Sequence, residues 1–161
     1  MPVFLSGLPV HVLVVHAVVV LVPLSALAAV IIAVWPAARR RYGWLVVGLT
    51  ALATACVPIA TSSGEDLRDR LVPTDLIRQH AQLGGQLLVF VIGLLVFVAA
   101  LVWFGRDTAR SPKVIVPLLA MLSVAFAITS AVQVVRIGDS GARAAWSAVQ
   151  YTAPQRSCDN G

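Results

Sequence analysis

The chain has 161 residues, of which 59% are hydrophobic and only 12% are charged, and its mean hydropathy is +0.90. A soluble domain carries about 25% charged residues, so this composition excludes an ordinary soluble globular protein. The net charge of +5 does not indicate a nucleic-acid-binding protein, because the basic residues lie in short segments beside long apolar runs.

The first apolar stretch, from Leu8 to Trp35, predicts a membrane span. No Lys, Arg, Asp or Glu precedes Arg39, and about 20 helical residues are enough to cross the hydrocarbon. A secretory signal peptide would have a basic start and an apolar run of roughly 7–15 residues, so we expect this span to be retained. His11 and His16 lie in its first half and need polar partners there.

A basic turn over residues 36–44 leads into a second span over residues 44–61. The polar segment that follows predicts a short surface helix within residues 62–75. A serine at 62 or 63 would be its N-cap, and Glu65 and Asp66 would lie in its first turn, where the helix dipole favours acids.

Thr74 is predicted to cap a helix that begins at Asp75 and continues into a third span over residues 81–104. A second basic turn precedes the fourth span, residues 114–135. Small residues recur every fourth position in that span, which lets a neighbouring helix approach closely. They are Ser123, Ala127 and Ala131.

Residues 138–161 form the predicted tail, with a short amphipathic surface helix that carries Trp146. The sequence thus predicts an all-α polytopic membrane protein, a bundle of four transmembrane helices over residues 1–137 followed by this tail. No internal repeat is evident.

The distribution of charge predicts the orientation of the four spans. The turns after the first and third spans carry six basic residues and one acid, whereas the 62–80 segment and the tail carry six of each. Because Lys and Arg in short loops stay in the cytoplasm, we expect both termini to be extracytoplasmic.

This topology gathers polar side chains in the outer half of the bundle. The histidines His11, His16 and His80 are candidate ligands for haem b or a metal, since imidazoles from different helices commonly hold iron in membrane bundles. His11 and His16 are about 140° apart around their helix, so only one of them can face His80 squarely. The remaining polar residues at this level are Gln82, Gln86, Thr129, Ser130 and Gln133.

Two alternatives to ligation remain open. Each histidine can simply bond a backbone carbonyl, Thr129, Gln133 or an acid of the outer loop, or the histidines can form a proton relay. Neither Cys56 nor Cys158 has a second thiol nearby, and no nucleophile elbow or metalloprotease motif is present. We therefore expect no enzymatic activity and no confident metal site.

Several short motifs resemble a known family of bacterial membrane proteins, catalogued as domain of unknown function 2231. These motifs are Leu8-Pro9-Val10-His11 with His16, Ser63-Gly64-Glu65, His80-Ala81 with Leu83-Gly84, and the segment from Arg136 to Ala142 with Trp146. The resemblance covers nearly the whole chain and implies a four-helix bundle of no established activity. That family often has histidine at the position of Asp139, so the aspartate removes one potential ligand here.

The leading functional hypothesis is a non-enzymatic accessory subunit of a larger inner-membrane complex, such as a lipid transporter or a respiratory assembly. Lipid-facing small residues would dock it in the bilayer, and its outer loop and tail would contact other membrane subunits. The alternative is a haem-binding electron carrier that uses His80 with His11 or His16. The docking candidates outside the membrane are Glu65, Asp66, Asp139, Arg143 and Trp146.

Overall fold

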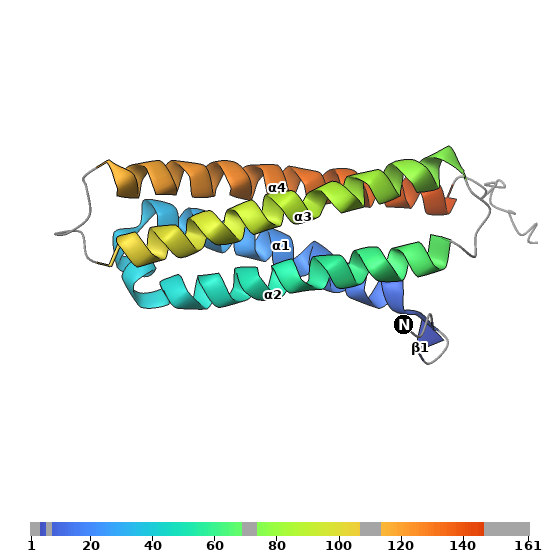
Figure 1. Cartoon of the computed structure of the whole chain (residues 1–161), viewed down its shortest axis with the longest axis horizontal. Coiled ribbons are helices and arrows are strands. Elements are labelled where there is room, and N and C mark those ends of the chain that lie inside the picture. The colour runs from blue at the N-terminus through green and yellow to red at the C-terminus, as the bar shows by residue number, and fades with distance from the viewer. Residues whose placement is uncertain (1–3, 6–7, 69–73, 107–113, 147–161) are drawn as a thin grey trace, which may run out of the picture.

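The computed structural model describes residues 4–5, 8–68, 74–106 and 114–146, and within them the chain forms four long helices (Figure 1). A two-residue antiparallel strand pair, which the sequence does not predict, precedes the first helix. The strands are β1 (Phe4–Leu5) and β2 (Leu8–Pro9), and the helices are α1 (Val10–Val34), α2 (Pro36–Arg68), α3 (Asp75–Phe104) and α4 (Ile115–Trp146).

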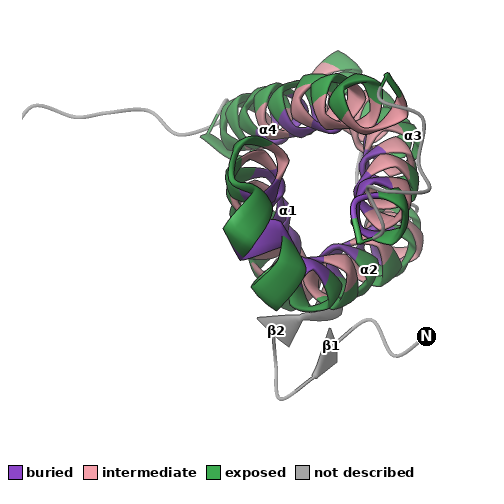
Figure 2. Cartoon of the chain, turned by 90° about the vertical axis from the view of Figure 1, so that its left-hand side faces the viewer, coloured by how far each residue is buried: buried purple, intermediate pink, exposed green. Residues whose placement is uncertain are grey.

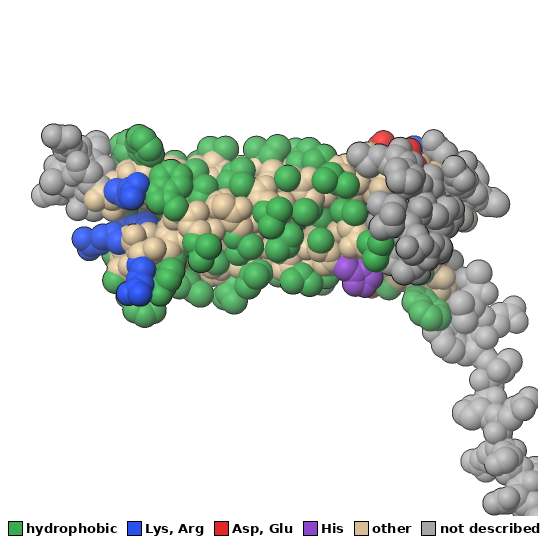
Figure 3. Space-filling view, turned by 90° about the horizontal axis from the view of Figure 1, so that it is seen from below, with side chains coloured by type: hydrophobic (Ala, Val, Ile, Leu, Met, Phe, Trp, Pro, Cys, Tyr) green, Lys and Arg blue, Asp and Glu red, His purple; other side chains and the backbone are tan. Residues whose placement is uncertain are grey.

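All four helices are long and apolar enough to cross a membrane, which confirms the all-α four-helix membrane bundle. Their 25 to 33 residues correspond to about 37–50 Å, longer than the hydrocarbon of about 30 Å. Basic side chains gather at one end of the bundle and histidine at the other (Figure 3). We call these the arginine end, with Arg39, Arg40, Arg41 and Arg106, and the histidine end, with His11 and His80.

The helices form a ring in which each one packs against two neighbours (Figure 2). The order around the ring is α1, α2, α3 and α4, so α1 and α3 occupy opposite corners. Buried residues line the inside of the ring, and large apolar side chains face outward, as a lipid environment requires. The inner face joins two apolar clusters, one around Val22 and Val91 and one around Ile32 and Leu94.

The predicted second span, residues 44–61, is shorter than α2 at both ends. Only Trp35 separates α1 from α2, and the arginines of the predicted basic turn lie in the first turns of α2. Pro36 suits this start because the first helical position needs no backbone N–H donor. The predicted surface helix over 62–75 is wrong as a separate element, since α2 continues to Arg68. The hydroxyls of Ser62 and Ser63 donate to the carbonyls of Ile59 and Ala60 instead of capping a new helix.

The predicted separate tail helix is wrong for the same reason, because α4 continues through Gly138 to Trp146. The small-residue stripe of α4 also faces the inside of the bundle: Ser123 and Ala127 are buried, so the prediction that these residues face lipid is wrong. The Thr74 cap is confirmed, since its hydroxyl accepts from the N–H of Ile77. The remainder of the tail, residues 147–161 with Cys158, lies outside the described residues.

The hairpins α1–α2 and α3–α4 bury side chains at matching levels of their first helices. Buried side chains follow His11 of α1 by 7, 11, 18 and 21 residues and follow His80 of α3 by the same four intervals, which the helical period places on one face. Each hairpin thus presents one buried face to the other. The matched residues are Val18 with Leu87, Val22 with Val91, Ala29 with Val98, and Ile32 with Leu101.

Candidate functional site

The histidine end brings His11 of α1 and His80 of α3 together across the bundle. The centroids of their rings are 6.5 Å apart, and the ring planes are nearly perpendicular, at 89°. We call these two residues the histidine pair. Because α1 and α3 occupy opposite corners of the ring of helices, the two imidazoles meet across the inside of the bundle.

The ring of His11 is held by α2 through its Nδ1 atom. Nδ1 lies 3.0 Å from the carbonyl oxygen of Ala60 and 3.4 Å from the hydroxyl oxygen of Ser63. The hydroxyl of Ser63 donates to the same carbonyl at 3.0 Å, so it can accept from Nδ1–H. The three groups form a closed triangle that fixes the orientation of the ring.

The ring of His80 is held by α4 in the same way. Its Nδ1 lies 3.2 Å from the carbonyl oxygen of Ile137 and 3.1 Å from the hydroxyl oxygen of Ser140. Ser140 in turn donates to the carbonyl of Ile137 at 2.9 Å. The two hairpins thus repeat not only their buried residues but also the hydrogen bonds that hold their histidines.

These hydrogen bonds determine the tautomer of both rings. A carbonyl oxygen can only accept, so Nδ1 of each imidazole must carry the proton. In the neutral ring the lone pair then lies on Nε2. None of the hydrogen bonds between described residues involves Nε2 of His11 or of His80, so both lone pairs are available to a ligand. This arrangement, with one nitrogen anchored and the other open, is the one that metal-bound histidines adopt.

A glycine lies against each ring of the histidine pair. A Cβ atom at Gly64 would lie 2.8 Å from Cε1 of His11 and 3.6 Å from its Nε2, and a Cβ at Gly141 would lie 3.0 Å and 3.8 Å from the same atoms of His80. Contacts of 2.8 Å are shorter than real Cβ atoms tolerate, so Gly64 allows α2 to approach the ring. Nε2 is the third nearest atom to the added Cβ in both cases, so a side chain at either glycine would also approach the open nitrogen.

The distance between the rings matches a shared metal atom. A point midway between the centroids is about 3.2 Å from each. A metal–nitrogen bond of about 2.0–2.1 Å, added to the roughly 1.1 Å between a ring nitrogen and its centroid, gives the same value. The distance between the centroids is therefore short enough for both imidazoles to reach one metal atom when both Nε2 atoms face it.

His16 does not join the histidine pair. It is exposed, on the outward side of α1, as the angle of about 140° between it and His11 requires. Of the polar residues predicted at this level, Gln133 is buried and donates to the carbonyl of Leu83 at 3.2 Å and to the side-chain oxygen of Gln86 at 3.4 Å. Gln82 is exposed and belongs to no such contact among the described residues.

Thr129 and Ser130 take different positions on α4. Thr129 faces outward and donates to carbonyls of its own helix. Ser130 is fully buried, and its hydroxyl has no hydrogen-bond partner among the described residues. Of the residues predicted at this level, the structure therefore brings together His11 with His80 and Gln133 with Gln86.

The predicted docking residues lie at the histidine end and are mostly exposed. Asp139 and Arg143 form an ion pair one helical turn apart, with 2.9 Å between their closest atoms. Glu65 is exposed, Asp66 is half-buried, and Trp146 is 60% exposed at the end of α4. These side chains gather around the rim of the bundle and not in its interior.

Sequence reasoning missed the residues that anchor the histidine pair. The signal was present as two Ser-Gly pairs, Ser63-Gly64 and Ser140-Gly141, each on the helix that follows a histidine-bearing helix. A carbonyl three residues before each serine completes the anchor, but any residue can supply it. The motif is therefore visible only once the two hairpins are superposed.

Among known protein families, one described as "Predicted membrane protein (DUF2231)" matches residues 7–154, nearly the whole chain. No curated protein and no solved structure matches the chain. This four-helix membrane bundle, with its axial histidine pair, therefore belongs to the DUF2231 family of predicted membrane proteins.

Proposed function

We propose that this protein is a membrane-bound b-type haem protein that uses His11 and His80 as axial ligands and transfers electrons. The observation that carries the proposal is the histidine pair itself: two imidazoles on different helices, 6.5 Å apart, each anchored at Nδ1 and open at Nε2. Bound haem would supply a one-electron redox centre. The residues of the chain would hold it, orient the imidazoles and separate it from lipid.

The donor set favours haem over a free metal ion. A structural or catalytic zinc site needs three or four protein ligands, and no group of three His, Cys, Asp or Glu residues gathers in the part of the chain that the structure describes. A haem iron receives four nitrogens from the porphyrin and needs only two from the protein. Two imidazoles across a bundle therefore suffice for haem and are too few for zinc.

Open space next to His80 supports this proposal. Gly84 is one helical turn further along α3, on the same face as His80. A Cβ atom at Gly84 would meet no atom within 4 Å, whereas the glycines that touch the rings have no such room. We propose that an edge of the porphyrin would use the space beside Gly84.

A leucine at this position tests the proposal. The purified protein, titrated with haem in detergent, is expected to develop a Soret band and a bis-imidazole low-spin spectrum. Gly84→Leu would fill the space beside His80 without touching either imidazole, so it should weaken haem binding at least tenfold while the helix content stays unchanged. Gly48→Leu is the matched control, because Gly48 also has open space but lies in the half of α2 near the arginine end. A wild-type chain with no Soret band would refute the haem proposal.

The orientation follows from the charges. Under the positive-inside rule, we propose that the arginine end faces the cytoplasm and that the histidine end is extracytoplasmic, in a bacterial inner membrane. Trp44 and Trp103 pack edge to face at the arginine end, 6.5 Å between centroids, where an interfacial anchor is expected. Leu83 lies about 20 residues from Trp103 toward the histidine end of α3, and about 20 helical residues cross the hydrocarbon. The histidine pair then lies just outside the hydrocarbon, within reach of a soluble or membrane-bound redox partner.

We also propose that the protein works as a non-enzymatic subunit beside other membrane proteins. The observation that favours this is the rim of the histidine end, where α2 and α4 extend past the hydrocarbon and expose Glu65, the Asp139–Arg143 pair and Trp146. Isolation from native membranes in a mild detergent should recover a larger complex that contains a redox protein. A chain that always runs alone would contradict this part of the proposal.

A further inference from the structure

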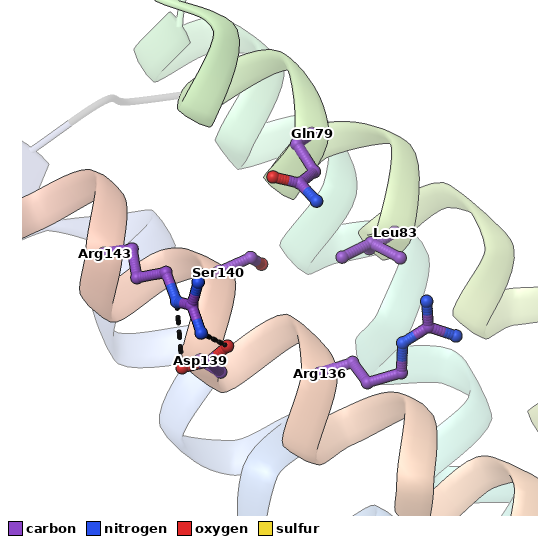
Figure 4. Close-up of a pocket in the computed structure, with 6 residues that line it drawn as sticks. All are labelled: Gln79, Leu83, Arg136, Asp139, Ser140 and Arg143. Atoms are coloured by element: carbon purple, nitrogen blue, oxygen red, sulfur yellow. Dashed lines mark hydrogen bonds and ion pairs between the residues drawn. The ribbon is translucent and has the colours of Figure 1, made fainter.

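The histidine end carries a small polar cavity beside the histidine pair (Figure 4). It has a volume of about 120 Å³ and lies between α3 and α4. Ser140, which bonds Nδ1 of His80, is one of its walls. The residues that line it are Gln79 and Leu83 of α3 and Arg136, Asp139, Ser140 and Arg143 of α4.

The charges around this cavity are not balanced. Asp139 is engaged by Arg143, whose guanidinium contacts both of its carboxylate oxygens, at 3.2 Å and 2.9 Å. Arg136 forms no hydrogen bond or ion pair with another described residue, and its side chain lies along the cavity from the opposite side in Figure 4. The cavity therefore presents one uncompensated guanidinium, together with the side-chain amide of Gln79.

The depth of the cavity determines which ligands can reach it. Its floor, Leu83, is about 20 helical residues from Trp103 of the arginine end, the thickness of the hydrocarbon. The cavity is thus at the level of the lipid headgroups and one residue from Gly84, beside which a porphyrin edge would lie. Carboxylates and phosphates are the groups for which a free guanidinium at this level is suited.

We propose that this cavity is a binding site for an oxyanion group, held by Arg136 with Gln79 as a second donor. The group is either a propionate carboxylate of haem or the phosphate of an anionic phospholipid. Only the first of these sources rests on the proposed haem function. Asp139 sets the affinity by holding Arg143 away from the ligand and by adding one negative charge to the wall.

Two titrations test the proposal and separate the two sources. In the first, haem-free protein in detergent is titrated with phosphatidylglycerol and with phosphatidylcholine, and bound lipid is counted by native mass spectrometry. In the second, the protein is titrated with haem and with haem dimethyl ester, whose propionates carry no charge. Each titration uses the wild type, Arg136→Gln, Asp139→Asn and the control Arg78→Gln. Arg78 is also exposed on α3 at the histidine end, but it pairs with Asp75 and does not line the cavity.

Arg136→Gln should weaken binding of the acidic ligand about tenfold, the usual effect of losing one charge-assisted hydrogen bond, and leave the uncharged analogue unaffected. Asp139→Asn should strengthen binding of the acidic ligand, and Arg78→Gln should leave binding of both ligands unchanged. If Arg136→Gln weakens binding of phosphatidylglycerol alone, the bound group is a lipid phosphate. If Arg136→Gln weakens binding of haem but not of haem dimethyl ester, the bound group is a propionate. If Arg136→Gln binds every ligand like the wild type, or Arg78→Gln weakens binding equally, the proposal is overturned. The lipid series tests the role of Arg136 even if the protein binds no haem.

Discussion

His11→Ala and His80→Ala are each expected to weaken haem binding by at least a hundredfold and to remove the bis-imidazole low-spin spectrum. Each variant deletes one of the two proposed ligands, and no other histidine of the described residues lies opposite the one that remains. Loss of a residue that only orients a ligand already costs about 10–100-fold in metal affinity, so loss of the ligand itself should cost more. Absorption spectra during haem titration measure both effects.

His16→Ala is the control for these variants. His16 lies five residues from His11 on the same helix but is exposed on its outward side. Its replacement should leave the Soret band and the affinity unchanged. If His16→Ala removed the band and His11→Ala kept it, α1 would have to present its other face to His80, and the histidine pair would not be the site.

Gly64→Val and Gly141→Val are expected to reduce haem binding by about 10–100-fold without changing either ligand. A Cβ at Gly64 would lie 2.8 Å from the ring of His11, which must shift, and a Cβ at Gly141 would lie 3.0 Å from the ring of His80, which must give by a few tenths of an ångström. Both changes displace the rings from the positions at which Nδ1 is hydrogen-bonded. Haem titration gives the loss of affinity, and circular dichroism shows whether the helices are retained.

Gly138→Val is the matched control for Gly141→Val. Gly138 lies on the same helix, one turn earlier, and a Cβ there would meet no atom within 4 Å. Both substitutions place a β-branched residue in α4 at similar cost to helix propensity. If the two variants lose haem affinity equally, the lower helix propensity of α4, and not the contact with His80, is the cause of the loss.

The four-helix architecture could be predicted from the sequence because it follows from length and hydropathy. Twenty or more apolar residues must cross the bilayer as helix, and the basic turns separate one crossing from the next. The ends of α2 and α4 could not be predicted in the same way. Ser62, Ser63 and Gly138 are typical of helix termini in water, but here the serines bond carbonyls of the same helix. The ends of α2 and α4 also bond the histidine of the preceding helix, which favours continued helix.

The candidate site was predicted only in part. The spacing of polar residues identified the histidines, and depth favoured His11 over His16 as the partner of His80, as the structure shows. The anchors were not predictable, because Ala60 and Ile137 act through backbone carbonyls that carry no sequence signature. The prediction that Ser123 and Ala127 face lipid is wrong, since both are buried. Small residues also allow close helix packing inside a bundle, and their spacing does not show whether they face lipid or the interior.

The division of the site between two equivalent hairpins has a consequence for biogenesis. One imidazole arrives with the N-terminal hairpin and the other with the C-terminal hairpin, so in the proposed haem protein neither half of the nascent chain would hold the iron with two imidazoles. Loading of the proposed cofactor would then wait until α3 and α4 are inserted and the halves have associated. The cell would thereby avoid leaving a half-ligated, peroxide-reactive iron exposed on an unfinished polypeptide.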